Sequence, residues 1–312
     1  MTKNTAVRDT KVLIVTNLKG GVSKTTATLH LAAGLAELGR KSLVVDFDST
    51  GGATSLLGVP DFGPWPSAYE FITGSEDAAD CILTDGGEFT LPHGVDLVPG
   101  SQKLEELDVW LTNNRYIAQQ DLLTKPMEQV KGQYDYVFID LPPRISPATV
   151  PSMKAADGVV LCAIPEDAAV RYLTRTWNDV QQARQYGLKV EVLGILLTGI
   201  RKPLTRLARH LIGQVAQAPE FTRADGSPLK FDTDISLGVA MQESQAARQT
   251  LFQYEPDHTI CEQYRAVVRE LEARIKLQER STLVPTPPPA QPAPPAVGEE
   301  ATPAVTKEAA NG

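Results

Sequence analysis

The chain has 312 residues, of which 42% are hydrophobic, and carries a net charge of −8. This composition suits one large α/β domain or two smaller ones, and it excludes a global positive field that would attract nucleic acid. Three widely separated cysteines and four histidines, none at ligand spacing, argue against a disulfide framework, an iron–sulfur centre and a zinc site.

The N-terminal segment 1–10 lacks the apolar core of a signal peptide, and no apolar run reaches the length of a membrane span. We therefore expect a cytoplasmic protein without a membrane partner. Segment 1–10 is expected to be a short extension ahead of the folded domain.

The first strong pattern is a strand at 11–16, a glycine loop, and a helix from Lys24 to Leu38 with Gly39 as its stop. The loop reads Lys19, Gly20, Gly21, Val22, Ser23, Lys24, Thr25, Thr26. Strand, glycine loop and helix start form the layout of a phosphate-binding loop, because glycines let backbone N–H groups approach an anion at the positive end of a helix. Lys24 supplies a mobile charge, and the Thr25 hydroxyl can ligate Mg²⁺ on bound phosphates. The alternative is a glycine turn before an ordinary helix.

The next strand, Leu43–Val45, ends in Asp46-Phe47-Asp48 at the edge of the sheet where ligands bind in open α/β folds. Two carboxylates at this edge are costly unless a cation or proton is near, which makes them candidate site residues. The alternative is a solvated turn with a helix-capping aspartate.

The middle of the chain predicts smaller elements and a second site strand. We expect a short helix over 67–73 and a strand pair over 88–91 and 95–98. The apolar strand that ends in Ile139 then delivers Asp140, and Pro142 and Pro143 end it. This is the Walker B layout, in which the acid holds Mg²⁺ through water.

The second half alternates strands and helices. We expect strands over 159–164 and 190–197 and helices over 167–185, 203–214 and 257–278. The alternation predicts an α/β fold with a doubly wound, mostly parallel sheet and helices on both faces. From residue 281 the chain is rich in Pro and Ala, which predicts a disordered tail over 281–312.

The loop does not meet the strict pattern G-x-x-x-x-G-K-[ST], but its variant K-G-G-x-x-K-[ST]-T resembles the deviant Walker ATPases of the ParA/MinD class, and the ParA branch most closely. Asp46-Phe47-Asp48 and Ile139-Asp140-Leu141-Pro142-Pro143 resemble the D-x-D and I-D-x-P-P signatures of that family. The chain resembles the short form, without a helix-turn-helix domain ahead of the ATPase. Ser23 stands where the family often has Gly, and Ser49-Thr50 replace the usual Pro-Gln.

The resemblance implies a P-loop ATPase domain over 11–280 with ATP and Mg²⁺ as cofactors. Lys24 and the loop backbone would hold phosphates, while Thr25, Asp48 and Asp140 would serve the metal. Asp48 would also position the attacking water. Lys19 would reach the nucleotide of the partner subunit, so that ATP closes a homodimer. Lys19, Lys24 and Asp48 are thus the expected catalytic residues.

The resemblance further implies that the ATP-bound dimer binds DNA non-specifically on the nucleoid, until a ParB-like protein or cargo adaptor stimulates hydrolysis. A local basic cluster offers candidate DNA contacts: Arg201, Lys202, Arg206 and Arg209. The last three have i, i+4, i+7 spacing on an expected helix. Such residues would hold phosphates without reading sequence, although a solvated helix face explains them equally well.

Two other functions remain to be weighed. The first is an ATP-regulated protein-positioning or assembly factor that does not bind DNA. The second is an electron-transfer ATPase of the nitrogenase iron-protein type, which the cysteine spacing does not support. The Pro/Ala-rich tail is no basic amphipathic helix, which disfavours the membrane anchoring of MinD.

Overall fold

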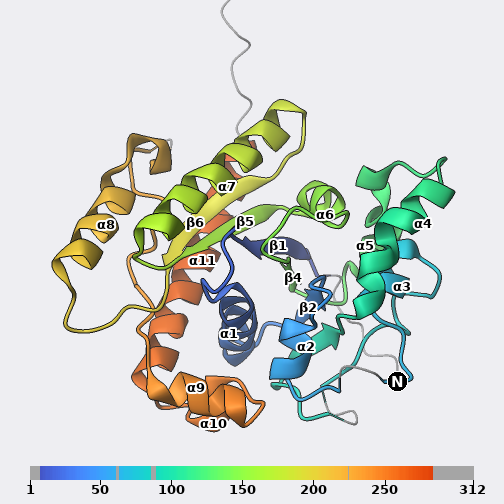
Figure 1. Cartoon of the computed structure of the whole chain (residues 1–312), viewed down its shortest axis with the longest axis horizontal. Helices are drawn as coiled ribbons and strands as arrows, with labels where there is room; N and C mark the ends of the chain where they lie inside the picture. Colours follow the sequence, from blue (N-terminus) through green and yellow to red (C-terminus); the bar gives the residue numbers. More distant parts are fainter. Residues whose placement is uncertain (1–7, 61–62, 86–88, 224, 284–312) are drawn as a thin grey trace, which may run out of the picture.

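A six-stranded sheet forms the centre of the computed structural model, which describes residues 8–60, 63–85, 89–223 and 225–283. All neighbouring strands run parallel, in the order β3-β2-β4-β1-β5-β6 (Figure 1). The strands are β1 (Lys11–Thr16), β2 (Ser42–Asp46), β3 (Val95–Val98), β4 (Tyr136–Asp140), β5 (Gly158–Ala163) and β6 (Glu191–Leu197). The predicted parallel, doubly wound fold is confirmed.

Helices cover both faces of the sheet, because successive strand residues point to opposite sides. Val12 and Ile14 of β1 belong to one hydrophobic core, and Leu13 and Val15 to the other. The first core lies under α3 (Ala68–Thr73), α4 (Leu107–Asn113), α5 (Thr124–Val130), α6 (Thr149–Ala155), α7 (Asp167–Gln185) and α8 (Arg206–Gln217). The second lies under α1 (Lys24–Glu37), α2 (Gly52–Leu56), α9 (Val239–Ala246), α10 (Leu251–Tyr254) and α11 (Thr259–Leu283). Three short 3₁₀ helices complete the set: η1 (Gln102–Glu106), η2 (Gln119–Asp121) and η3 (Pro219–Phe221).

The predicted strand pair over 88–91 and 95–98 is wrong in part. Residues 95–98 form β3, but 89–91 are not a strand, and 86–88 lie outside the described residues. β3 pairs in parallel with β2, and its other edge is taken by Leu83, which exchanges two backbone hydrogen bonds with Leu97 at 2.8 and 2.9 Å. With both edges occupied there, no further strand can pair with β3 at that point.

Two helices differ from their predicted bounds. α8 begins at Arg206 rather than at 203, because the Thr205 hydroxyl accepts the Ala208 N–H at 3.1 Å and so caps the helix. α11 covers Thr259–Leu283 rather than 257–278, so residues 281–283 are helical and not part of a disordered tail as predicted. Residues 284–312 of the predicted tail lie outside the described residues, as do 1–7. Within the described part of the chain, no helix combines the length and apolar character needed to cross a membrane.

Candidate active site

The loop between β1 and α1 is fastened to the strands on its flank. Asn17 donates to the Cys162 carbonyl oxygen at 2.7 Å and accepts the Lys19 N–H at 2.9 Å. Further along, the Thr198 hydroxyl donates to the Val22 carbonyl oxygen at 3.2 Å. These contacts tie the loop to the ends of β5 and β6, so its position is set by the sheet.

The backbone of the loop turns through two left-handed residues. Gly21 has φ +73° and Ser23 has φ +60°. Glycine adopts this region freely, whereas a side-chain-bearing residue pays roughly 1–2 kcal/mol. The conformation at Ser23 therefore explains why glycine is frequent at this position in the family that the loop resembles.

Lys24 starts α1 and lies beneath the loop. Only 6% of its surface is exposed, and its ammonium donates to the Lys19 carbonyl oxygen at 3.2 Å. Burial lowers the pKa of Lys24, opposed by the nearby carboxylates of Asp140 and Asp48. A buried ammonium held by a neutral carbonyl can be turned toward a bound phosphate.

Thr25 and Asp140 meet below the loop, as the two motifs predict. The Thr25 hydroxyl donates to Asp140 Oδ2 at 2.7 Å. Asp140 is fully buried, and burial together with the neighbouring Asp46 carboxylate raises its pKa well above the usual range. A hydroxyl beside a buried carboxylate is a donor set that fits Mg²⁺, which binds few protein oxygens and keeps several waters.

The two acids after β2 have different surroundings. Asp46 is buried and accepts the N–H and the hydroxyl of Thr54 at 2.9 and 2.8 Å and the Asp48 N–H at 3.1 Å. The Thr54 hydroxyl in turn accepts the Gly100 N–H at 2.7 Å. A Cβ at Gly100 would lie 2.9 Å from the Asp46 carboxyl carbon, so the packing there requires glycine. Asp46 therefore organises the turn.

Asp48 is the acid that remains accessible. It is half-buried, and its Oδ1 accepts the N–H and the hydroxyl of Thr50 at 2.9 and 2.8 Å. Thr50 thus orients the Asp48 carboxylate. Thr50 stands where glutamine is usual in the family that this chain resembles. The second carboxylate oxygen stays available for water.

Lys19 points back to its own chain. Its ammonium lies 2.7 Å from Glu166 Oε2, in the turn between β5 and α7. The Lys19 side chain is 22% exposed and the Glu166 side chain 61% exposed. The pair is therefore open to water and to exchange of partners.

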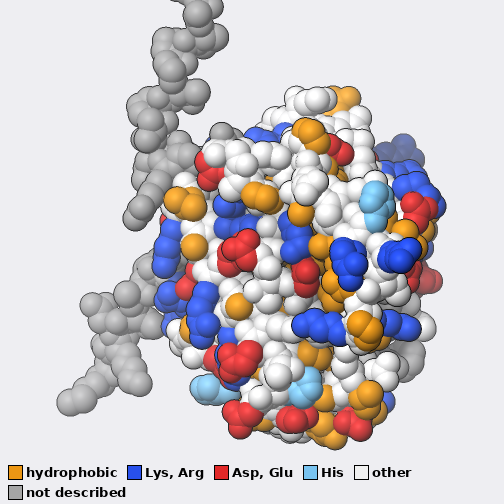
Figure 2. Space-filling view, turned by 90° about the vertical axis from the view of Figure 1, so that its left-hand side faces the viewer, with side chains coloured by type: hydrophobic (Ala, Val, Ile, Leu, Met, Phe, Trp, Pro, Cys, Tyr) orange, Lys and Arg blue, Asp and Glu red, His pale blue; other side chains and the backbone are white. Residues whose placement is uncertain are grey.

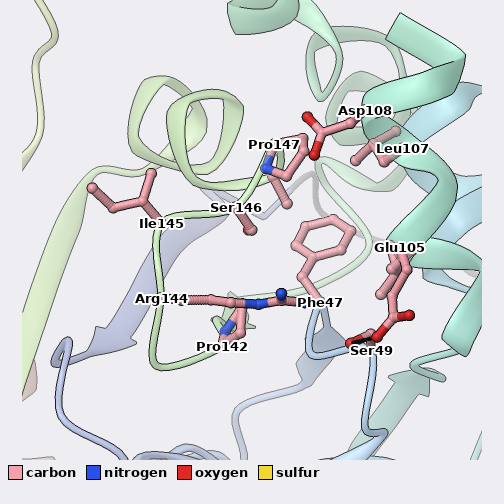
Figure 3. Close-up of a pocket in the computed structure, with 12 residues that line it drawn as sticks. Phe47, Ser49, Glu105, Leu107, Asp108, Pro142, Arg144, Ile145, Ser146 and Pro147 are labelled. Atoms are coloured by element: carbon pink, nitrogen blue, oxygen red, sulfur yellow. Dashed lines mark hydrogen bonds between the residues drawn. The ribbon is translucent and has the colours of Figure 1, made fainter.

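A cavity of about 260 Å³ lies beside these carboxylates (Figure 3). Phe47 and Ser49 flank Asp48 and form one wall, and Arg144 extends across the cavity from the loop after β4. Glu105 lies beside Ser49 on the same side, where its carboxylate accepts the Ser49 hydroxyl at 3.2 Å (Figure 3). The cavity therefore borders both segments that follow the sheet-edge acids.

The predicted basic cluster is exposed but is not one helical face. Arg206 and Arg209 lie in the first turn of α8, whereas Arg201 and Lys202 belong to the preceding loop. The prediction that Lys202 shares the helix is wrong, because capping at Thr205 starts the helix four residues after Lys202.

Sequence reasoning missed Glu166, although one clue was present. It lies just after the end of β5, which neighbours β1 in the sheet, and so must lie at the same edge as the loop. It also missed Gly100, Gln245 and His30, whose roles depend on contacts far apart in sequence.

Three features define the class of protein as a nucleoside triphosphatase of the P-loop type. They are the glycine-bearing loop after β1, the lysine beneath it, and the threonine–aspartate pair from α1 and β4. Comparison with known proteins refines it. Residues 10–192 match a family model described as an AAA domain. Chromosome partitioning protein ParA of Myxococcus xanthus is 30% identical over 274 residues, which cover 85% of this chain and 88% of that protein.

Chromosome-partitioning ATPase Soj of Thermus thermophilus is 30% identical over 267 residues, covering 85% of this chain and 96% of that one. Among solved structures, Cyanothece McdA superimposes with a TM-score of 0.71 at 20% identity, over 84% of this chain and 99% of that one. The chain belongs to the ParA/MinD superfamily of ATPases.

Proposed function

We propose that this protein is an ATP-driven partition or cargo-positioning switch, in which ATP closes a homodimer that binds DNA and hydrolysis opens it. The observation that carries the proposal is the pairing of the Lys24 loop with the Thr25–Asp140 contact, at 2.7 Å, beneath it. The names of relatives that are about 30% identical, which describe chromosome partitioning, support this class of function.

Each site residue has a role that follows from its position. Lys24 and the N–H groups of residues 20–23 would hold the phosphates. Thr25 and Asp140, with Asp48 through water, would hold Mg²⁺, which neutralises charge on the β- and γ-phosphates when bound. Asp48, already oriented by Thr50 at 2.8 Å, would position the attacking water.

Lys19 would join the two subunits. In the single chain it is paired with Glu166 at 2.7 Å, on the exposed side of the loop. In a closed dimer it would leave Glu166 and approach the partner's triphosphate, where its charge is worth more because water is excluded. Nucleotide state would thereby set assembly state.

The closed dimer would bind DNA without sequence preference through Arg201, Lys202, Arg206 and Arg209, all of which are exposed. Figure 2 looks onto the side of the molecule that carries α8 and shows Lys and Arg side chains spread over much of this face, interspersed with acidic side chains, more of which lie along its lower edge. Because the net charge of the chain is −8, phosphate binding would depend on such local cations rather than on the overall charge. Dimers would thus associate with the nucleoid, and a ParB-like protein or cargo adaptor would stimulate hydrolysis.

Two measurements on the full chain test the proposal. Sedimentation with and without MgATP should show a dimer only with nucleotide, and co-sedimentation with non-specific duplex DNA should require the same nucleotide. A protein that dimerises with ATP but never pellets with DNA would instead be an assembly factor that works without DNA. A strict monomer in saturating MgATP would contradict both functions.

A further inference from the structure

Thr26, the last residue of the phosphate loop, is held from two sides by side chains that belong to neither motif. Its hydroxyl oxygen accepts the side-chain N–H of Gln245 at 3.1 Å. Its carbonyl oxygen lies 2.7 Å from Nδ1 of His30. Gln245 is on α9, more than two hundred residues further along the chain, so these contacts join the loop to the C-terminal part of the domain.

His30 acts as a neutral bridge between α1 and α10. Its Nε2 accepts the Leu251 N–H at 2.9 Å, so the ring proton must sit on Nδ1 and is donated to the Thr26 carbonyl oxygen. The ring is buried, with 2% exposed, and stacks on Tyr264 at 5.0 Å between centroids. The first turn of α1 and the start of α10 are therefore fixed relative to each other.

Gln245 has the more direct effect on the loop. Because the Thr26 oxygen already accepts a hydrogen bond from Gln245, the hydroxyl hydrogen of Thr26 is left free to be donated elsewhere. A loop that binds phosphates needs donors directed at the anion. The amide thus makes Thr26 a donor on the ligand side.

We propose that Gln245 is a positioning residue for the nucleotide: it orients the Thr26 hydroxyl toward the phosphates and thereby links α9 to occupancy of the loop. The inference rests on the proposed binding of ATP at residues 19–26. The end of α9 also approaches the helix that follows Asp48, since Arg248 donates to the Ser55 carbonyl oxygen at 3.5 Å. A shift of α9 would therefore alter its contacts with both α1 and α2, which lie on two sides of the phosphate site.

Affinity for MgATP, measured by calorimetry, tests this role. A neutral hydrogen bond contributes about 0.5–1.5 kcal/mol, so Gln245→Ala should weaken MgATP binding by about 2- to 12-fold. Gln242→Ala, on the exposed side of the same helix, is the matched control and should leave the affinity unchanged. The nucleotide-free Gln245→Ala protein should melt slightly lower than Gln242→Ala, because it has lost the hydrogen bond to Thr26, so both affinities are measured well below either melting temperature.

A double-variant comparison separates positioning from mere packing. Thr26→Val removes the oriented hydroxyl, so adding Gln245→Ala to it should cost no further affinity. Hydrogen exchange gives a second readout: MgATP should protect residues 239–254 in the wild type and less so in Gln245→Ala.

Equal affinities for Gln245→Ala and Gln242→Ala, or fully additive losses in the double variant, would overturn the inference while leaving ATP binding intact. Failure of the wild type to bind MgATP would instead reject the proposed function itself.

Discussion

The ammonium of Lys19 lies 2.7 Å from the Glu166 carboxylate of its own chain, so the residue expected to act across a dimer is engaged within the monomer. Both side chains remain in contact with water, and such pairs contribute about 0–1 kcal/mol. Releasing Lys19 should therefore cost little compared with the charge it would meet at a partner's triphosphate. In the proposed dimer, the contact would act as a weak restraint on closure.

Glu166→Gln should strengthen ATP-dependent dimerisation, because Lys19 no longer loses an ion pair when it moves. Each of the two subunits loses one such pair on closure, so removing up to about 1 kcal/mol per subunit corresponds to a dimer dissociation constant lowered by up to about 30-fold, measurable by analytical ultracentrifugation in MgATP. Asp167→Asn, which alters the neighbouring acid paired with Arg171, serves as the control. Identical dimerisation of wild type and Glu166→Gln would show that the pair exerts no restraint.

Lys19→Ala should abolish the ATP-dependent dimer while MgATP still binds the monomer, because Lys24 and the loop backbone stay in place. Sizing in MgATP measures the first effect and calorimetry the second. Retention of the dimer would refute the role of Lys19 across the interface.

Asp48→Ala should keep nucleotide binding but trap a DNA-bound dimer, since the attacking water loses its carboxylate. We expect hydrolysis to fall by about 10²- to 10⁴-fold, the range over which a positioned acid or base contributes. Phosphate release and DNA co-sedimentation follow the two effects. Rapid turnover by this variant would count against the assignment.

Replacing Arg206 and Arg209 by alanine should weaken DNA binding to all sequences alike. If each contacts a phosphate in both subunits of the dimer, the slope of log affinity against log salt should flatten by about 4. Arg171→Ala with Arg175→Ala removes the same charge from α7, at exposed positions, as the matched control. An unchanged slope for the α8 pair would remove these residues from the DNA footprint.

His30 predicts a loss of stability in acid. Burial lowers its pKa in the folded chain to about 4, against 6.5 ordinarily. Between these values the unfolded chain binds a proton that the folded chain does not, so stability present above pH 6.5 is lost as the pH falls toward 4. The loss should reach about 3 kcal/mol.

The His30 effect is measured as a difference between variants. Urea titrations give the unfolding free energies of the wild type and of His30→Gln. The advantage of the wild type over the variant should be about 3 kcal/mol smaller at pH 4 than at pH 7. A constant difference for His30→Gln would contradict a buried, neutral imidazole.

Local patterns predicted the parts of the fold that local chemistry decides. Unbroken apolar runs predicted β1 and β4, and Thr25, at the end of the loop after β1, lies beside Asp140, the last residue of β4, because neighbouring parallel strands end at one edge. The start of α8 was misplaced although Thr205, a strong capping residue, was visible in the sequence.

Other contacts had no local pattern to reveal them. Gln245 and Thr26 meet across more than two hundred residues, and only the packing of α9 against α1 decides that they do. The same holds for His30 and Leu251, whose hydrogen bond depends on where α10 begins. Contacts of this kind depend on tertiary packing, so the spacing of residues along the sequence does not predict them.

The hydrogen bonds around Asp46 distinguish it from Asp48, the other acid of the motif. The Asp46 carboxylate accepts the Thr54 hydroxyl, which in turn accepts the Gly100 N–H, so both ends of the segment 46–54 are held in place. Asp48, between these ends, is half-buried and keeps one carboxylate oxygen for water. The two acids of the motif thus differ in role: Asp46 is structural, and Asp48 is the acid placed for chemistry. Substituting Asp46 would disrupt the turn rather than remove the group expected to position the water.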